Sequence, residues 1–183
     1  KLILILTLLT FIILIVSFIY RHNNSDLSKI KDSGELKVLT INNANSYYIY
    51  REEKMGLEYD LVKAFADYLG VDLKIITPSW RNMIDSLKEG NGDIIAANMT
   101  ITNKREKQID FSDPYLPVQQ HVVIHKSNSD IDSLNDLNGE TIHINESTSY
   151  QDRLRELQQE GMDFKIKLYR DIPTQELLQK VAN

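Results

Sequence analysis

The sequence contains no cysteine, which excludes disulfide bonds, thiolate zinc sites and a cysteine nucleophile. It also lacks a run of lysine and arginine that would form a basic stripe, and its net charge is −5, so nothing indicates nucleic acid binding. No glycine-rich phosphate loop and no serine nucleophile motif is present. We therefore expect no catalytic site, no metal site and no cofactor in these residues.

Charge is also absent from the first part of the chain, between Leu2 and Tyr20. A helix of that length spans about 28 Å, close to the thickness of a hydrocarbon core. A cleaved signal peptide would end in small residues and a lipoprotein would need a cysteine, and neither is found. We therefore predict an uncleaved signal anchor at residues 1–20, followed by a polar tether at residues 21–33.

The next part of the chain alternates between strand and helix patterns. Strands are predicted at residues 36–41, 73–76 and 93–97, and helical spacing of apolar residues at 57–69 ends at Gly70. A second helix is predicted to begin at Pro78-Ser79. Such alternation is typical of an α/β layer with a parallel sheet.

A second series of elements follows an extended apolar run at 118–125. Strands are predicted at 141–145 and 164–168 and helices at 148–158 and 175–182, with Thr148 and Gln151 at capping-box spacing. The interpretation is a bilobal molecule. It has lobe 1 at residues 34–117, a hinge strand at 118–126 and an incomplete lobe 2 at 127–183. Because the chain begins with Lys1 and ends inside a predicted helix, we expect a fragment of a longer product.

Ligands of open α/β sheets bind beyond the carboxyl ends of the strands. The predicted strands lead to an arginine, polar residues and aromatic rings: Arg105, Asn98, Thr100, Thr102, Trp80, Tyr47 and Tyr48. An arginine fork matches a carboxylate, threonine hydroxyls can bind the same oxygens, and aromatic rings can pack on an apolar group. The set suits a small zwitterion such as an amino acid.

Each of these residues also has a simpler interpretation. An arginine in a threonine-rich turn is more often a surface ion-pair partner, as Arg105 would then be. Trp80 at helical spacing is more often a core residue, and the two tyrosines could cover a sheet edge. Taken alone, the residues leave both interpretations open.

Other pairs are set aside on geometry. His121 and His125 lie on an extended run, where four residues span about 13 Å, so they cannot share one metal ion. Asp110 and Asp113 are at a turn before Pro114 and are more often structural than paired catalytic acids.

Two segments, "GLEYDLVKAFADYLGVDLKI" (56–75) and "GDIIAANMTITNKREKQIDFSDPYL" (92–116), resemble family 3 extracellular solute-binding proteins. The resemblance covers almost all of residues 34–183 and implies a type II periplasmic-binding-protein-like fold. It implies that Arg105 holds a ligand carboxylate with help from Asn98 and Thr100, and that the aromatic positions pack on the ligand. It also implies that Ser147 and Thr148 add donors at a helix start. The family's amine-binding aspartate falls after residue 183.

A narrower resemblance is carried by "NSYYIYREEKMGLEYDLVKAFADYLGV" and "DFSDPYLPVQQHVVIHK". These stretches are similar to the non-catalytic N-terminal module of membrane-bound lytic murein transglycosylases of the F type. That resemblance implies an amino-acid or muropeptide ligand, a catalytic domain later in the chain, and a periplasmic location with an anchor at residues 2–20. A free-standing receptor for an amino-acid importer or sensor, and a scaffold that binds nothing, are the alternatives.

Overall fold

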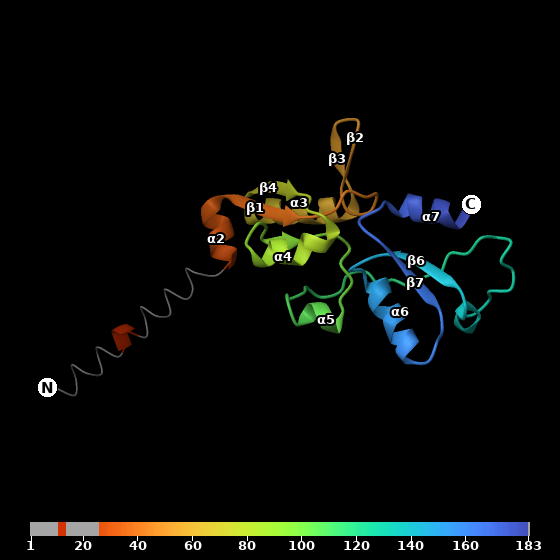
Figure 1. Ribbon diagram of the computed structural model, residues 1–183. Coiled ribbons are helices and arrows are strands. Elements are labelled where there is room, and N and C mark those ends of the chain that lie inside the picture. The colour runs from red at the N-terminus through yellow and green to blue at the C-terminus, as the bar shows by residue number, and fades with distance from the viewer. Residues whose placement is uncertain (1–10, 14–25, 183) are drawn as a thin grey trace. The chain divides into compact units, whose positions relative to one another are not determined.

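The computed structural model describes residues 11–13 and 26–182 (Figure 1). Within those ranges no helix has both the length and the apolar character that crossing a membrane requires. Most of the predicted anchor at residues 1–20 lies outside the described residues, as does the start of the predicted tether, so the anchor stays a prediction.

The chain forms two compact units. Of the described residues, the first unit comprises those up to 78 together with 85–99, and the second comprises 79–84 together with 100–182. Trp80 and Arg105 therefore belong to the same unit although 24 residues separate them. The lobe boundaries predicted from the sequence, at residues 117 and 127, remain a prediction.

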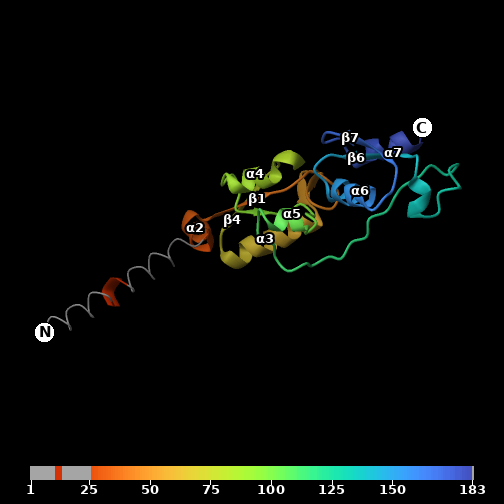
Figure 2. The same cartoon turned by 60° about the horizontal axis from the view of Figure 1, so that its bottom comes forward.

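A parallel sheet with the strand order β4-β1-β5 forms the centre of the first unit. Its strands are β1 (Glu35–Leu39), β4 (Asp72–Ile76) and the short β5 (Ile94–Ile95). Helices α3 (Leu57–Leu69) and α4 (Met83–Lys88) lie on opposite sides of the sheet (Figure 2). Apolar side chains of β1 and α3 form the core: Leu36, Val38, Val62 and Ala66. Leu36 and Val38 lie on the strand face that the alternating pattern predicted. The apolar face predicted for the helix was Leu57, Leu61, Ala64, Phe65, Tyr68 and Leu69, and it is largely wrong, because Leu57, Leu61, Phe65 and Tyr68 are exposed while Val62 and Ala66 are buried.

Two elements of the first unit were not predicted. Helix α2 (Asp26–Ser33) forms in the expected tether because its one apolar contact, Ile30, is buried against the sheet core. A hairpin of β2 (Tyr48–Tyr50) and β3 (Glu53–Met55) forms where a polar loop was expected. The strands are three residues long, and no asparagine-glycine or aspartate-glycine pair marks their turn, so the usual hairpin signal is missing.

Glycines fix both ends of helix α3. Gly70 ends the helix in a left-handed conformation, with φ of 73°, as the sequence predicted. Gly56 precedes the helix with φ of 135°, and a Cβ atom there would overlap the backbone carbonyl of Ser46. Gly56 is therefore required both by its conformation and by the close approach of the Ser46 backbone.

The second unit contains a two-stranded parallel sheet of β6 (Thr141–Asn145) and β7 (Lys165–Tyr169), joined by helix α6 (Ser149–Gln159). Helix α7 (Thr174–Ala182) follows, and the short elements are η1 (Trp80–Asn82), α5 (Asn103–Glu106) and η2 (Leu134–Leu137). Figure 1 shows α6 beside the two strands. One apolar cluster joins α6 to the sheet: Leu137, Ile144, Leu154, Leu157 and Phe164.

The predicted hinge strand at 118–126 does not form a strand. Residues 110–125 contain neither helix nor strand, and Val118, Val122 and Val123 are exposed. A β-like pattern produces a strand only where a neighbouring strand accepts its hydrogen bonds. The described part of the chain provides no such neighbour for this run.

We predict that Gly56→Ala destabilises the fold more than Gly70→Ala does. Gly70 is in the left-handed conformation, which costs an L-residue about 1–2 kcal/mol, and Gly56, with φ of 135° and ψ of 147°, is in a region that almost only glycine adopts. Only at Gly56 does the added methyl group also meet backbone, whereas Gly70 has open space around it. Urea unfolding of the two variants measures the difference. Equal midpoints would show that the Ser46 backbone moves aside without cost.

Candidate functional site

Arg105 is a buried arginine, with 5% of its surface exposed. It lies in helix α5, a single turn that begins after Thr102. Its Nη1 donates to the carbonyl oxygen of Thr100 at 2.8 Å, and its Nη2 donates to the carbonyl oxygen of Ser147 at 3.2 Å. The guanidinium therefore lies inside the second unit, and its two hydrogen-bond acceptors are backbone carbonyls.

Trp80 reaches the same carbonyl. Its Nε1 donates to the Ser147 oxygen at 2.9 Å, and the Arg105 guanidinium carbon lies 5.4 Å from the centre of its ring. That distance is within the range of a cation–π interaction. Trp80 and Arg105 thus meet at one oxygen atom of Ser147, although the three residues are far apart in the sequence. No periodicity in the sequence could have predicted this contact.

The two threonines predicted at the site have different roles. Thr102 is the N-cap of α5, and its hydroxyl accepts a hydrogen bond from the backbone N–H of Arg105. It therefore fixes the start of the turn that carries the arginine. Thr100 supplies its carbonyl to Arg105, while its hydroxyl lies 3.4 Å from that of Ser149. Ser149, the first residue of α6, was not predicted as a site residue.

The start of helix α6 differs from the predicted capping box. Thr148 is the N-cap residue but makes no side-chain cap bond, and its hydroxyl donates instead to the carbonyl of Asn145. The Gln151 side chain accepts from the N–H of Ser147 rather than from that of Thr148. Ser147 has a positive φ of 62°, which moves its backbone out of register with a regular cap.

The charge of Arg105 has no direct counter-ion among the residues that the structure describes. Within the described residues no carboxylate lies within ion-pair distance of it. Burial lowers the pKa of the Arg105 guanidinium, and the more distant Asp152 carboxylate opposes that shift. An arginine nevertheless stays protonated at physiological pH. The site therefore holds a buried positive charge that is compensated by neutral dipoles and one distant carboxylate.

Nearby surface charges are paired with each other. Arg81 contacts Glu146 at 2.8 Å and Lys104 contacts Asp152 at 3.4 Å. Both pairs are partly exposed, so each contributes about 1 kcal/mol or less. Because Glu146 precedes Ser147 and Arg81 follows Trp80, the first pair connects the same two segments that meet at the Ser147 carbonyl.

Asn98 belongs to the first unit and is held by a buried carboxylate. Its backbone N–H donates to Glu58 Oε1 at 2.6 Å, and its Nδ2 donates to the Ser46 hydroxyl at 3.0 Å. Asn98 has φ of 50°, and Glu58 is 3% exposed. The role of Glu58 was not predicted, because an acidic residue in the first turn of a helix is equally typical of an exposed surface.

The two predicted tyrosines also belong to the first unit. Tyr47 is buried, and its ring centre lies 5.7 Å from that of Tyr59. Tyr48 begins strand β2 and pairs with Met55. Tyr47 is therefore packed as a core side chain, whereas Tyr48 is half-buried on the hairpin.

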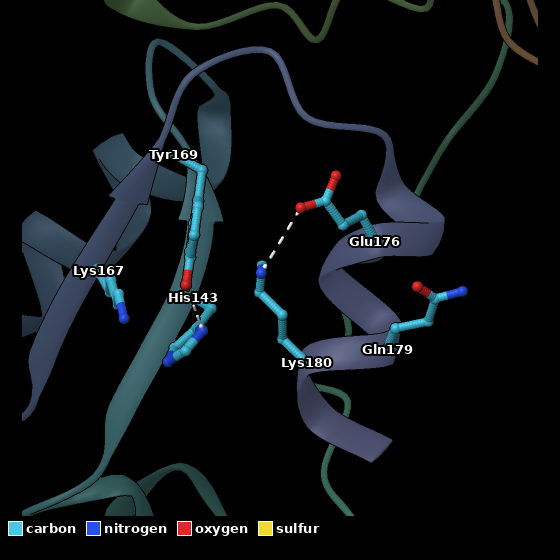
Figure 3. Close-up of a pocket in the computed structure, with 6 residues that line it drawn as sticks. All are labelled: His143, Lys167, Tyr169, Glu176, Gln179 and Lys180. Atoms are coloured by element: carbon cyan, nitrogen blue, oxygen red, sulfur yellow. Dashed lines mark hydrogen bonds and ion pairs between the residues drawn. The ribbon is translucent and has the colours of Figure 1, made fainter. Parts of the chain in front are cut away.

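A separate pocket of about 370 Å³ lies in the second unit, between the sheet and helix α7 (Figure 3). It is lined by His143, Lys167, Tyr169, Glu176, Gln179 and Lys180. The Tyr169 hydroxyl is 3.0 Å from His143 Nδ1, and Lys180 pairs with Glu176. None of the predicted binding residues lines this pocket, and no cluster of three or more metal-ligating side chains occurs in the described residues.

Comparison with known proteins identifies the family. Residues 36–182 match the family of bacterial extracellular solute-binding proteins, family 3. The chain belongs to that family. The membership confirms the resemblance found in the two segments at residues 56–75 and 92–116, and the matched range includes parts of both compact units.

The proteins similar to this chain include two kinds. The chain is 53% identical over 163 residues to membrane-bound lytic murein transglycosylase F of Desulfosudis oleivorans strain Hxd3, which covers 89% of the chain and 36% of that protein. Overall the chain spans about a third of the length of such curated relatives. The narrower resemblance is thus confirmed at the level of sequence similarity.

Solved structures of the second kind are amino-acid-binding proteins. The ancestral amino acid-binding protein AncCDT-1 superimposes with a TM-score of 0.76 at 31% identity, covering 86% of this chain and 70% of that one. An ancestral arginine-binding protein bound to arginine gives a TM-score of 0.71 at 31% identity, covering 81% and 65%. These likenesses confirm the predicted α/β fold. The incomplete second lobe stays a prediction.

We predict that His143 makes the chain less stable in acid. Burial, followed by the charges of Lys167 and Lys180, lowers the pKa of His143 below its ordinary value. As pH falls below about 6.5, the unfolded chain takes up a proton that the folded chain resists, so folding stability decreases. The fall in melting temperature between pH 7.5 and pH 5 should be smaller in His143→Gln than in wild type.

The exposed His121 provides the control, because His121→Gln should leave that fall unchanged. An identical fall for His143→Gln and wild type would contradict the assignment.

Proposed function

We propose that the chain binds a small ligand with a free carboxylate, most simply an α-amino acid, through Arg105. The proposed site also includes Trp80, Thr100, Thr102, Ser147 and Thr148, which belong to the same compact unit as Arg105. The binding roles of Asn98, Tyr47 and Tyr48 stay predictions from the sequence. The site works without a cofactor or metal ion. The amino-acid class is supported by the 31% identical relatives, one of which is an arginine-binding protein bound to arginine.

The observation that carries this proposal is a buried guanidinium for which residues 11–13 and 26–182 provide no direct counter-ion. Keeping a charge out of water is costly unless it is paired, and a structural arginine is normally paired with a carboxylate. Arg105 instead donates to two neutral carbonyls. A ligand carboxylate would supply the missing negative charge and accept two parallel hydrogen bonds from the fork.

We further propose that this binding module is the non-catalytic sensor part of a peptidoglycan lytic transglycosylase. The support is the 53% identity to a protein of that name, of which the chain spans about a third. The module would then lie in the bacterial cell envelope, held at the membrane by residues 2–20, with the folded part in the periplasm. Ligand binding would act on a catalytic domain elsewhere in the same chain by shifting a conformational equilibrium.

A second candidate function is that of a free-standing amino-acid receptor for an importer or a sensor. It is favoured by the solved relatives, which are amino-acid-binding proteins of which the chain covers about two thirds. The reading frame after residue 183 separates the two functions. A lysozyme-like segment with a catalytic glutamate supports the transglycosylase, whereas a stop codon soon after the second lobe supports the receptor.

Replacement of Arg105 should abolish ligand binding. We expect Arg105→Ala to remove the calorimetric signal with amino acids and muropeptides. We expect Arg105→Lys to weaken binding at least about tenfold, because a point charge replaces a two-pronged donor. The full chain is titrated with L-arginine, L-glutamine and a muropeptide mixture.

Arg153→Ala is the matched control, since Arg153 lies in the same unit but is exposed and paired with Glu156 and Glu160. It should bind as wild type does. Equal affinity of Arg105→Lys and wild type would contradict two-pronged recognition. If no ligand produces heat even with folded wild-type chain, the domain is a scaffold and the proposed function is wrong.

A further inference from the structure

Two side-chain donors converge on the carbonyl oxygen of Ser147. The indole Nε1 of Trp80 lies 2.9 Å from that oxygen and the Nη2 of Arg105 lies 3.2 Å from it. A carbonyl oxygen has two lone pairs, so these two bonds use its whole capacity. All three groups belong to the second compact unit, so the arrangement does not depend on how the two units are placed.

The neutral carbonyl oxygen of Ser147 is a weaker hydrogen-bond acceptor for a cation than a carboxylate oxygen would be. Arg105 is a buried cation, and a hydrogen bond between a cation and a carboxylate is roughly twice as strong as one between neutral groups. A carboxylate oxygen at the same position would accept both hydrogen bonds and also neutralise the charge. The Ser147 carbonyl oxygen therefore stands in for one oxygen of a carboxylate.

From this geometry we propose that Trp80 is a hydrogen-bond donor to the ligand carboxylate, through its indole N–H, alongside Arg105. The inference rests on the proposed function and assigns Trp80 a role other than apolar packing. The ligand carboxylate takes the place that the Ser147 carbonyl occupies in the free chain. The Ser147 carbonyl thus competes with the ligand carboxylate for the same two donors, and the ligand must displace it.

The orientation of the indole supports a role for its edge. One face of the ring lies beside the Arg105 guanidinium, at 5.4 Å, and its N–H edge is directed at the shared oxygen. The same contact keeps guanidinium and indole in fixed relation to each other. A carboxylate would thus meet two donors that are already oriented, which reduces the entropy lost on binding.

The backbone of Ser147 is held in a conformation that is energetically unfavourable for serine. Ser147 has φ of 62°, in the left-handed region that serine rarely adopts. Its N–H is held by Gln151 and the preceding Glu146 is held by Arg81. Displacement by ligand would release this strain, which is of the kind that accumulates at binding sites.

Replacing Trp80 by phenylalanine tests the donor role, because the ring is kept and the N–H is lost. L-arginine and L-argininamide serve as probes in calorimetric titrations of the full chain. We expect Trp80→Phe to weaken L-arginine binding about tenfold, as for a hydrogen bond to a charged group. The loss for L-argininamide, which has no carboxylate, should be a smaller factor. Tyr150→Phe, which alters an exposed aromatic residue of α6, is the control and should bind both probes as wild type does.

The outcomes separate this inference from the proposed function. If Arg105→Ala abolishes L-arginine binding but folded Trp80→Phe binds as tightly as wild type, Trp80 is only a packing surface and the inference is wrong. If the loss in Trp80→Phe is equal for both probes, the N–H does not bind the carboxylate, which also overturns it. If neither Arg105→Ala nor Trp80→Phe changes binding, the proposed function itself fails.

A second measurement needs no ligand. Trp80 is the only tryptophan of the chain, so a ¹H–¹⁵N spectrum contains a single indole signal. In the free chain we expect its proton to exchange slowly with water, because it is hydrogen-bonded to the Ser147 carbonyl. L-arginine should shift that signal, since its acceptor changes. An indole proton that exchanges as fast as free tryptophan would overturn the convergent geometry.

Discussion

The structure of the candidate site depends on one constraint, a buried guanidinium that is satisfied by backbone carbonyls. Arg105 is 5% exposed and donates to the carbonyls of Thr100 and Ser147. Carbonyl dipoles stabilise a buried positive charge less than an anion does. A carboxylate bound at Arg105 would therefore lower the free energy of this site further. Trp80 contributes a ring beside the cation and an N–H to the same oxygen. The binding capacity proposed for this site would thus follow from incomplete electrostatic compensation.

A similar device holds the polar segment of the first unit. Asn98 directly follows the buried stretch that continues β5, and its backbone N–H is bonded to the buried carboxylate of Glu58 at the start of α3. Gly56 allows the chain to approach Ser46, whose hydroxyl accepts from the Asn98 side chain. In each unit, therefore, a loop beyond a strand is fixed by a buried charged side chain rather than by regular secondary structure. Such fixed loops are where binding residues are found on rigid α/β frameworks.

Membership of family 3 of the solute-binding proteins places this chemistry in a ligand-binding class, while the large transglycosylase relatives suggest its use. The same module suits a receptor and a sensor, because both need only that ligand affinity differ between two conformations. A receptor and a sensor differ in which part of the protein system responds to the change in conformation. The similarity to amino-acid-binding proteins and to lytic murein transglycosylase F is the ground for proposing one binding chemistry with two alternative outputs.

Apolar periodicity and helix stop signals act locally. The α/β class, the main helices and strands, and the residue types around Arg105 could therefore be predicted from the sequence. The end of α3 at Gly70 and the strand at Thr141–Asn145 are examples. The folded structure was needed to show that Trp80, Arg105 and the Ser147 carbonyl meet, that Tyr47 is packed against Tyr59, and that residues 118–126 form no strand. Those outcomes depend on which distant segments share a surface, since hydrogen-bond partners and buried neighbours come from parts of the chain that local patterns do not relate.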